Sequence, residues 1–418
     1  MRKTVFAAVA ATAALALGGC SNGDKTEEEV IEQSGDEAVV EEVEGDAKLV
    51  VWVDETREKA VQEAADAFEA DTGNKVELVK KNFDDIRTDF TTQVPSGHGP
   101  DITVGAHDWV GELVDNAVVA PVELGDAIDD YEESAISAFQ YDGQMYALPY
   151  AIENVALLRN VDLAPEAPAN WDDVLAMGGE AGTKYQFLIQ MNGEAGDPYT
   201  FYGLQTSFGS TVFKQNEDGS YTNELNLADG GAEFAQFLAD NGTNGTDVFN
   251  TDREYDIVLD AFAKGESPFL VGGPWMLDTI NEHDVNVAVD PIPSAGGQEA
   301  RPFAGVQGFY LSAQSKNPLL ATDFMVNYLG NEEIQLAMYE AGGRPPALKA
   351  AAEIAAEDPI TEGFMKAGAN ALPMPAIPEM GEVWDPWGKT EAAIVDGKEA
   401  DPAAAWEAMI ADIQSKIE

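Results

Sequence analysis

A β-branched apolar run, Lys-Leu-Val-Val-Trp-Val at residues 48–53, predicts the strand on which the fold is built. The run lacks polar alternation, which is typical of a strand buried on both faces of a parallel sheet. Apolar residues then recur at helical spacing from Val61 to Phe68, and Thr72-Gly73-Asn74 ends that helix. A buried strand followed at once by a helix is the repeating unit of an α/β fold.

The alternation of strands and helices continues along the chain. Residues 76–79 and 101–104 have the composition of strands, so we expect an α/β fold with mainly parallel sheets. About 370 residues follow position 46, and at roughly 100–200 residues per domain this length suggests two domains. The other expected elements are helices at 232–240 and 256–264, strands at 267–271 and 285–289, and a mainly helical last sixty residues.

The first twenty residues have the pattern of an export signal. Arg2 and Lys3 form a positive start, and residues 5–17 form an apolar stretch shorter than the roughly 20 residues that span a bilayer. Leu17-Gly18-Gly19-Cys20 resembles a bacterial lipoprotein signal, which implies that residues 1–19 are removed and that Cys20 carries a lipid. The alternative is an ordinary signal peptide with a chance cysteine. Cys20 is the only cysteine, so no internal disulfide is possible.

An acidic segment follows Cys20. Residues 20–46 contain Glu27-Glu28-Glu29 and Glu41-Glu42 with scattered Gly and Ser, one Lys and no aromatic residue. Such a segment buries too little apolar surface to offset the entropy lost on ordering. We therefore expect residues 20–46 to be a disordered tether that holds a folded domain away from a membrane.

Acidic residues far outnumber basic ones, 76 against 23, and the formal net charge is −53. Nucleic acid requires a basic surface, so this composition excludes a nucleic-acid partner. It also argues against direct adhesion to anionic lipid, which leaves the lipid on Cys20 as the expected membrane contact. Solubility or adaptation to salt accounts for the charge without a specific acidic partner.

A series of short motifs follows the first strand. The motifs are Phe68-Glu69-Ala70-Asp71-Thr72-Gly73, Gly99-Pro100-Asp101-Ile102, Ala106-His107-Asp108, Tyr146-Ala147-Leu148-Pro149-Tyr150-Ala151-Ile152-Glu153, Gly273-Pro274-Trp275, Pro302-Phe303-Ala304-Gly305-Val306, Ala347-Leu348-Lys349 and Met374-Pro375-Ala376-Ile377-Pro378-Glu379-Met380. Each is weak alone. In this order, from about residue 47 to the C-terminus, they resemble the maltose/maltodextrin-binding protein family.

The resemblance implies an extracytoplasmic solute-binding receptor of an ABC sugar importer. We expect a monomer, anchored to the cell membrane by lipid, that delivers sugar to the importer's membrane subunits. It also implies a periplasmic-binding-protein-like fold of two α/β lobes, with the ligand in the cleft between them and hinge closure on binding. The expected bounds are 47–152 plus 307–356 for the N-terminal lobe and 154–290 plus 359–418 for the C-terminal lobe, with crossings near 152–155, 289–307 and 356–361.

A sugar ring has apolar C–H faces and a rim of hydroxyl groups, and aromatic side chains suit the faces. The resemblance assigns aromatic platforms to Trp275, Tyr199 and Trp384. Trp387 either joins Trp384 or packs against it. Each of these indoles could instead lie in the core, which is the commoner position for tryptophan. Met374 matches a methionine that lines the family's binding site, with a core position as its alternative.

Carboxylates and other polar groups hold the hydroxyl rim. The resemblance assigns this role to Glu153 and Asp108, and Asp197 replaces a family glutamate. The family also has an acid followed by a base in the turn after the first strand. In this chain the turn is one residue shorter and offers Asp54, Glu55 and Arg57. We predict that Glu55 and Arg57 bind the sugar. Solvated surface acids and helix caps are the alternative readings of these carboxylates.

Three departures from the family surround the expected site. Gly105 stands where the family has a tryptophan, so that wall is either absent or supplied by Trp109. Arg87-Thr88 replaces a pair of glutamates, and Gly388, next to Lys389, replaces an arginine. The length and linkage of the preferred sugar therefore stay open, with malto-oligosaccharide first and trehalose or another α-glucoside second.

A secreted glycoside hydrolase is the alternative from another class, since it also combines aromatic platforms with carboxylates roughly 5–10 Å apart. The 76 acidic residues provide many accidental pairs, so their number does not exclude it. Gly-x-Ser-x-Gly is absent, and the three histidines, His98, His107 and His283, are too scattered for a zinc motif. We expect a binding protein without catalytic residues, metal or cofactor.

Overall fold

The computed structural model describes residues 47–216 and 220–417 of the 418-residue chain. The expected signal peptide, Cys20 and the tether lie outside the described residues. Within those ranges, no helix has both the length and the apolar character that crossing a membrane requires.

The 48–53 run forms a central strand of the first sheet, as its composition predicts. This seven-stranded sheet has the path β15-β14-β3-β1-β2, and β4 and β7 also pair with β14. Strand β1 pairs in parallel with both β2 and β3. The strands are β1 (Lys48–Val53), β2 (Lys75–Lys80), β3 (Ile102–Ala106), β4 (Val119–Ala120), β7 (Ala147–Asn154), β14 (Phe303–Ser312) and β15 (Leu372–Pro373).

Helix α1 shows why the chain turns where it does. The Asp54 side chain accepts hydrogen bonds from the backbone N–H groups of Thr56 and Arg57, and Gly73, at φ 74°, ends the helix. Its buried face carries the predicted apolar residues from Val61 to Phe68. The helices that flank the first sheet are α1 (Glu55–Thr72), α2 (Phe83–Gln93), α3 (Val110–Asp115), α4 (Glu133–Ala138), α10 (Pro318–Asp323), α11 (Glu332–Gly342) and α12 (Lys349–Ala355).

The second sheet has four strands in the order β13-β8-β12-β9. Helices α7 and α8 and strands β12 and β13 lie where the sequence predicts them, within about two residues. The strands are β8 (Ala156–Asn160), β9 (Leu188–Ile189), β12 (Phe269–Gly272) and β13 (Val287–Asp290), and the helices are α5 (Trp171–Ala181), α6 (Pro198–Thr206), α7 (Gly231–Asn241), α8 (Tyr255–Ala263), α9 (Leu277–Asn281), α13 (Pro359–Ala367), α14 (Trp384–Val395) and α15 (Pro402–Ile417).

Two hairpins and several single turns complete the described secondary structure. The hairpins are β5 (Gln140–Tyr141) with β6 (Gln144–Met145), and β10 (Phe213–Gln215) with β11 (Tyr221–Leu225). The 3₁₀ turns are His107–Trp109, Gly125–Asp130, Gly193–Ala195, Pro274–Met276 and Pro378–Glu382, and a π-helical turn spans Phe324–Leu329.

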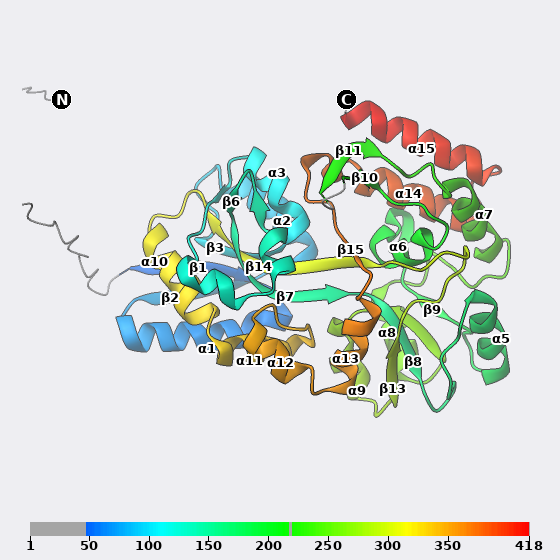
Figure 1. Ribbon diagram of the computed structural model, residues 1–418, viewed down its shortest axis with the longest axis horizontal. Coiled ribbons are helices and arrows are strands. Elements are labelled where there is room, and N and C mark those ends of the chain that lie inside the picture. Colours follow the sequence, from blue (N-terminus) through cyan, green and yellow to red (C-terminus); the bar gives the residue numbers. More distant parts are fainter. Residues whose placement is uncertain (1–46, 217–219, 418) are drawn as a thin grey trace, which may run out of the picture. The chain divides into compact units, whose positions relative to one another are not determined.

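Two strands connect the sheets. Strands β7 and β14 run side by side (Figure 1). They pair in antiparallel register, with Glu153 opposite Gly305. Their outer ends reach the second sheet, because β8 begins at Ala156 and Phe303 belongs to the second apolar core. The apolar core around the first sheet is drawn from residues 49–151 and 306–351. The cores around the second sheet are drawn from residues 155–303 and 360–413.

The expectation of mainly parallel sheets is wrong in detail, because both sheets are mixed. Strand β8 pairs antiparallel with β12 and with β13, and β14 pairs antiparallel with β3 and with β7. The chain enters β8 directly from β7 through Val155, without the crossover helix that a parallel pair needs. Strand pairs made by helical crossovers, such as β1 with β2, remain parallel.

Candidate functional site

The buried end of α1 carries the first group of polar side chains. The guanidinium of Arg57 is buried, donates to the hydroxyl of Tyr150 and pairs with Asp54. Its Cζ lies 4.9 Å from the ring centre of Phe83. Burial lowers the pKa of Arg57, and the neighbouring charge of Arg344 acts in the same direction. Arg57 is thus held in place and presents a donor beside an aromatic face.

Asp54, rather than Glu55, is the acid that accompanies Arg57. The Glu55 side chain is 85% exposed, and its carboxylate lies 4.0 Å from Lys80. The start of α1 turns position 54 inward and position 55 to solvent, so Glu55 does not join this buried group, and its role as a site residue stays a prediction.

Glu153 lies in the strand that links the two sheets. Its carboxylate accepts from Gln307 Nε2 at 2.9 Å and from Arg344 Nε at 2.5 Å. Glycine at 305, opposite Glu153, keeps the surface there open. A Cβ at that position would lie 3.2 Å from Glu153 Cγ and 3.6 Å from the Tyr199 hydroxyl. Because residue 305 has no side chain, Glu153 and Tyr199 both border the space beside Gly305.

Aromatic rings from the second half of the fold surround that space. Tyr199 and Trp275 are half-buried, with ring centres 6.3 Å apart. Tyr199 also stacks on Phe303 at 6.1 Å, and Trp384 meets the same ring edge-on at 5.9 Å. Three predicted platforms, Tyr199, Trp275 and Trp384, therefore belong to one aromatic cluster, and each keeps part of its surface exposed.

Trp387, by contrast, is fully buried. Its indole stacks under Trp384 at 5.7 Å, and its Nε1 donates to Gln205 Oε1 at 3.1 Å. It supports Trp384 and has no free face, so the suggested direct role of Trp387 is wrong. Met374 is likewise buried in the second core, although its carbonyl accepts from His107 Nε2 at 3.1 Å.

Asp108 follows this histidine. Val306 N–H donates to His107 Nδ1, so the proton sits on Nε2, and burial lowers the pKa of His107 to about 4. Burial also raises the pKa of Asp108 to about 6. Its negative charge acts on Tyr199, whose pKa is raised well above 10 mainly by burial. The charge of Asp108, in the first half of the fold, therefore acts on Tyr199, in the second half.

Asp197 begins the helix that carries Tyr199. Its carboxylate accepts from Thr200 N–H at 3.1 Å and from the Gln190 side chain, so it caps α6. Burial raises its pKa to about 6. The hydrogen bonds of Asp197 are thus those of a helix cap, which is the alternative given for this carboxylate. By capping α6, Asp197 fixes the position of Tyr199.

Four side-chain atoms in this region are buried and lack a hydrogen-bond partner in the described part of the chain: Arg57 Nη2, Asp108 Oδ1, Tyr199 OH and Gln307 Oε1. Burying a polar atom without a partner costs about 1–3 kcal/mol, so a group of them calls for an explanation. They combine donors with acceptors, and Arg57 lies over the aromatic face of Phe83. Such a set suits a ligand with many hydroxyl groups.

The structure shows the surroundings of two of the departures from the family, Gly388 and Arg87. Gly388 packs so closely on the chain that a Cβ there would lie 2.0 Å from the Ala195 carbonyl oxygen. Lys389 is exposed and pairs with Asp385, so it does not replace the missing arginine. Arg87 lies 3.6 Å from Glu112 in a half-exposed ion pair.

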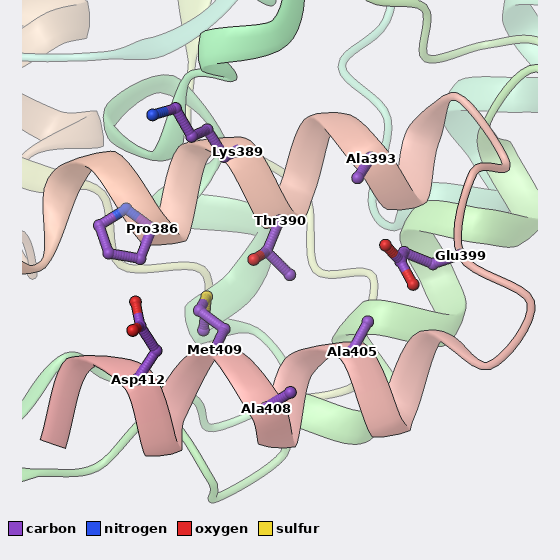
Figure 2. A pocket seen from close by; sticks show the side chains of 9 residues that line it. All are labelled: Pro386, Lys389, Thr390, Ala393, Glu399, Ala405, Ala408, Met409 and Asp412. Atoms are coloured by element: carbon purple, nitrogen blue, oxygen red, sulfur yellow. The ribbon is translucent and has the colours of Figure 1, made fainter. Parts of the chain in front are cut away.

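The described surface also has a pocket of about 380 Å³ between α14 and α15. Figure 2 shows how the two helices flank it, and none of the predicted sugar-binding residues lines it. Small side chains such as Ala393, Ala405 and Ala408 leave this space. It is separate from the aromatic cluster.

Comparison with known proteins assigns the family. A family model described as bacterial extracellular solute-binding protein matches residues 63–365, which is more than half of the chain. The chain belongs to this family. As a member of an extracellular family, the solute-binding protein works outside the cytoplasm.

Individual relatives confirm the resemblance to maltose/maltodextrin-binding proteins. The solute-binding protein is 26% identical over 374 residues to a galactooligosaccharide-binding protein of Bacillus subtilis, covering 86% of this chain and 87% of that one. It is 28% identical over 403 residues to a maltooligosaccharide ABC transporter solute-binding lipoprotein of Streptococcus pneumoniae, covering 92% and 90%. The structure of the Thermus thermophilus maltotriose binding protein bound with maltotriose matches at a TM-score of 0.81 and 30% identity, over 88% of this chain and 100% of that one. This likeness confirms the two-lobed, periplasmic-binding-protein-like α/β fold.

Sequence reasoning missed Arg344, Gln307, Tyr150 and Phe83, which all contact predicted site residues of this solute-binding protein. A signal existed for Arg344, a lone charge in the segment Gly342-Gly343-Arg344-Pro345-Pro346. Gln307 follows the Pro302 to Val306 motif directly. Phe83 had no signal, because only the packing of α2 brings it to Arg57.

Proposed function

We propose that this solute-binding protein captures malto-oligosaccharides and delivers them to an ABC importer. The unpartnered buried atoms of Arg57, Asp108, Tyr199 and Gln307, together with the aromatic cluster of Tyr199, Trp275 and Trp384, carry the proposal. Relatives that bind maltooligosaccharide or maltotriose, by their names, support it.

The residues divide the work of binding by chemistry. Trp275, Tyr199 and Trp384 cover the C–H faces of glucose rings. Asp108, Glu153 and Gln307 accept hydrogen bonds from the rim hydroxyls, while Arg57 donates to ring and hydroxyl oxygens. Asp197 acts through Tyr199, whose helix it caps. No covalent step is involved.

The expected lobe bounds become part of the proposal. The lobes comprise residues 47–152 plus 307–356 and residues 154–290 plus 359–418, which agrees with the division of the apolar cores. Closure of the lobes around sugar is a hinge motion in which β7 and β14 bend. The importer's membrane subunits then receive the closed form of a monomeric receptor.

Membrane attachment is proposed through a lipid on Cys20, with residues 20–46 as the tether. The pneumococcal relative is itself named a lipoprotein. Cell fractionation tests this point, because Cys20→Ala should move the protein from the membrane to the medium. Unchanged membrane association would contradict a lipid on Cys20.

A second ligand class has specific support. One relative is named for galactooligosaccharides, so galactooligosaccharides compete with malto-oligosaccharides as the ligand. Trehalose and other α-glucosides remain the alternatives within the first class.

Calorimetric titration with maltose, maltotriose, trehalose and a galactooligosaccharide tests the proposal, with a product assay on the same mixtures. We expect saturable heat with maltose or maltotriose, weaker or no heat with the galactooligosaccharide, and no released glucose. Heat from the galactooligosaccharide alone would reassign the ligand. Release of glucose would support a glycoside hydrolase instead.

A further inference from the structure

Arg344 lies where a loop of the first half of the fold touches the second half. It follows α11 and the left-handed residue Gly343, at φ 64°. A Cβ on Gly343 would lie 2.7 Å from the carbonyl oxygen of Pro274, so the loop rests against the turn that presents Trp275. Glycine is required at 343 both for this approach and for the positive φ.

The Arg344 guanidinium contacts three segments at once. Its Nε donates to Glu153 Oε2 at 2.5 Å, and its Nη1 lies 3.3 Å from Thr56 Oγ1. Its Cζ lies 5.5 Å from the ring centre of Trp275. The side chain is only 11% exposed, so these contacts are little screened by solvent.

Only a planar, multiply donating cation can make these contacts together. Guanidinium offers five N–H donors in a fixed fork and also stacks on an aromatic face, whereas a lysine ammonium is a point charge. Glu153 keeps acceptor capacity for another ligand, because a carboxylate accepts about four hydrogen bonds. Arg344 therefore fixes Glu153 without saturating it.

We propose that Arg344 is a positioning residue that holds Glu153 and Trp275 at a fixed separation. The carboxylate then meets the hydroxyl rim of the same sugar ring whose face the Trp275 indole covers. Arg344 acts through these two residues, and its own contact with sugar is not required. The inference rests on the proposed sugar-binding function.

Titration of maltotriose into Arg344→Lys, Glu153→Gln and the double variant tests the proposal. Arg344→Lys keeps the charge but loses the fork, and we expect it to weaken affinity by about tenfold. The double variant should lose clearly less affinity than the product of the two single fold-losses, because each single variant already disrupts the same Arg344–Glu153 pair. A purely structural role would lower the unfolding midpoint without such coupling in affinity.

Arg159→Lys is a matched control. Arg159 is also buried and pairs with a carboxylate, Asp290, at 2.7 Å, in the second sheet. The Arg159→Lys variant should be less stable, and its maltotriose affinity should stay within about twofold of the wild-type value. The positioning role of Arg344 would be overturned if Arg344→Lys bound maltotriose with wild-type affinity. It would also be overturned if the fold-losses of Arg344→Lys and Glu153→Gln simply multiplied in the double variant. Either result would leave the proposed function standing. Failure of the wild-type protein to bind any sugar would overturn the proposed function and this inference together.

Discussion

The indole of Trp109 lies directly over Gly105: a Cβ at position 105 would lie 2.6 Å from two carbons of that ring. Trp109 is 7% exposed and packs on Phe83, with ring centres 5.2 Å apart. Trp109 thus occupies the space above residue 105, where the family has a tryptophan beside the sugar. Its burial favours a core position, and a wall formed by Trp109 itself stays an untested alternative.

Trp275→Ala and Trp109→Ala should therefore fail in different ways. Trp275 is half-exposed in the aromatic cluster, so its loss should weaken maltotriose affinity roughly tenfold to hundredfold with a small effect on stability. Trp109→Ala removes a buried indole and should cost about 3–5 kcal/mol of unfolding free energy. Calorimetry and urea denaturation on both variants measure the two effects. Equal affinity losses at unchanged stability would show that Trp109 contacts the sugar.

Affinity should fall as the pH drops below about 6. Burial raises the pKa of Asp108 to about 6, and a sugar hydroxyl that donates to its carboxylate favours the ionised form. Below that pH the free protein carries a proton on Asp108, and sugar binding must release it. Affinity should therefore fall by up to about tenfold for each pH unit below 6. Titrations from pH 5 to pH 8 measure the profile.

Asp108→Asn is the matched variant for this profile. It should bind more weakly at pH 7.5 and lose most of the pH dependence. Asp197, whose pKa is also raised to about 6, accepts from its own helix, so Asp197→Asn should preserve the slope. A flat wild-type profile would mean that the ionised Asp108 receives no hydroxyl.

Glu391→Gln should stabilise the protein at neutral pH. Glu391 is fully buried in α14, and neither carboxylate oxygen has a hydrogen-bond partner within the described residues. Burial raises its pKa well above 4.5, so the folded state keeps a proton that the unfolded state releases. Stability from this group is fully present below about pH 4.5 and declines as the pH rises toward the folded pKa.

The gain from Glu391→Gln should accordingly be near zero at pH 4 and clearly larger at pH 7.5. Urea denaturation at the two pH values measures it. Glu382→Gln, an exposed change close in sequence, should alter stability by less than about 0.5 kcal/mol at either pH. A loss of stability in Glu391→Gln at pH 7.5 would show that the carboxylate is ionised and bonded.

The sequence predicted the first strand and the helix after it because apolar periodicity reports burial directly. It misjudged the sheets as mainly parallel, because strand direction depends on how the chain enters the sheet. In the candidate site, the family resemblance named Glu153, Tyr199 and Trp275, which the fold brings close together. Periodicity and motifs carry no information on side-chain partners, so the bond from Arg344 to Glu153 was not foreseen.

The same limit applies to candidate site residues that are close together in the sequence. Glu55 and Arg57 are two positions apart, and only the start of α1 decides that one faces solvent and the other the interior. Trp384 and Trp387 are three apart on α14, and packing against Gln205 decides which indole is buried. Residue type and spacing permit either outcome in both pairs.

Calorimetric titration of the purified protein with maltotriose decides whether the chain is a malto-oligosaccharide receptor. We expect saturable binding of one maltotriose per chain, an affinity roughly tenfold to hundredfold weaker in Trp275→Ala, and no hydrolysis of the sugar. No heat with maltotriose, or binding unaffected by Trp275→Ala, would contradict the receptor role.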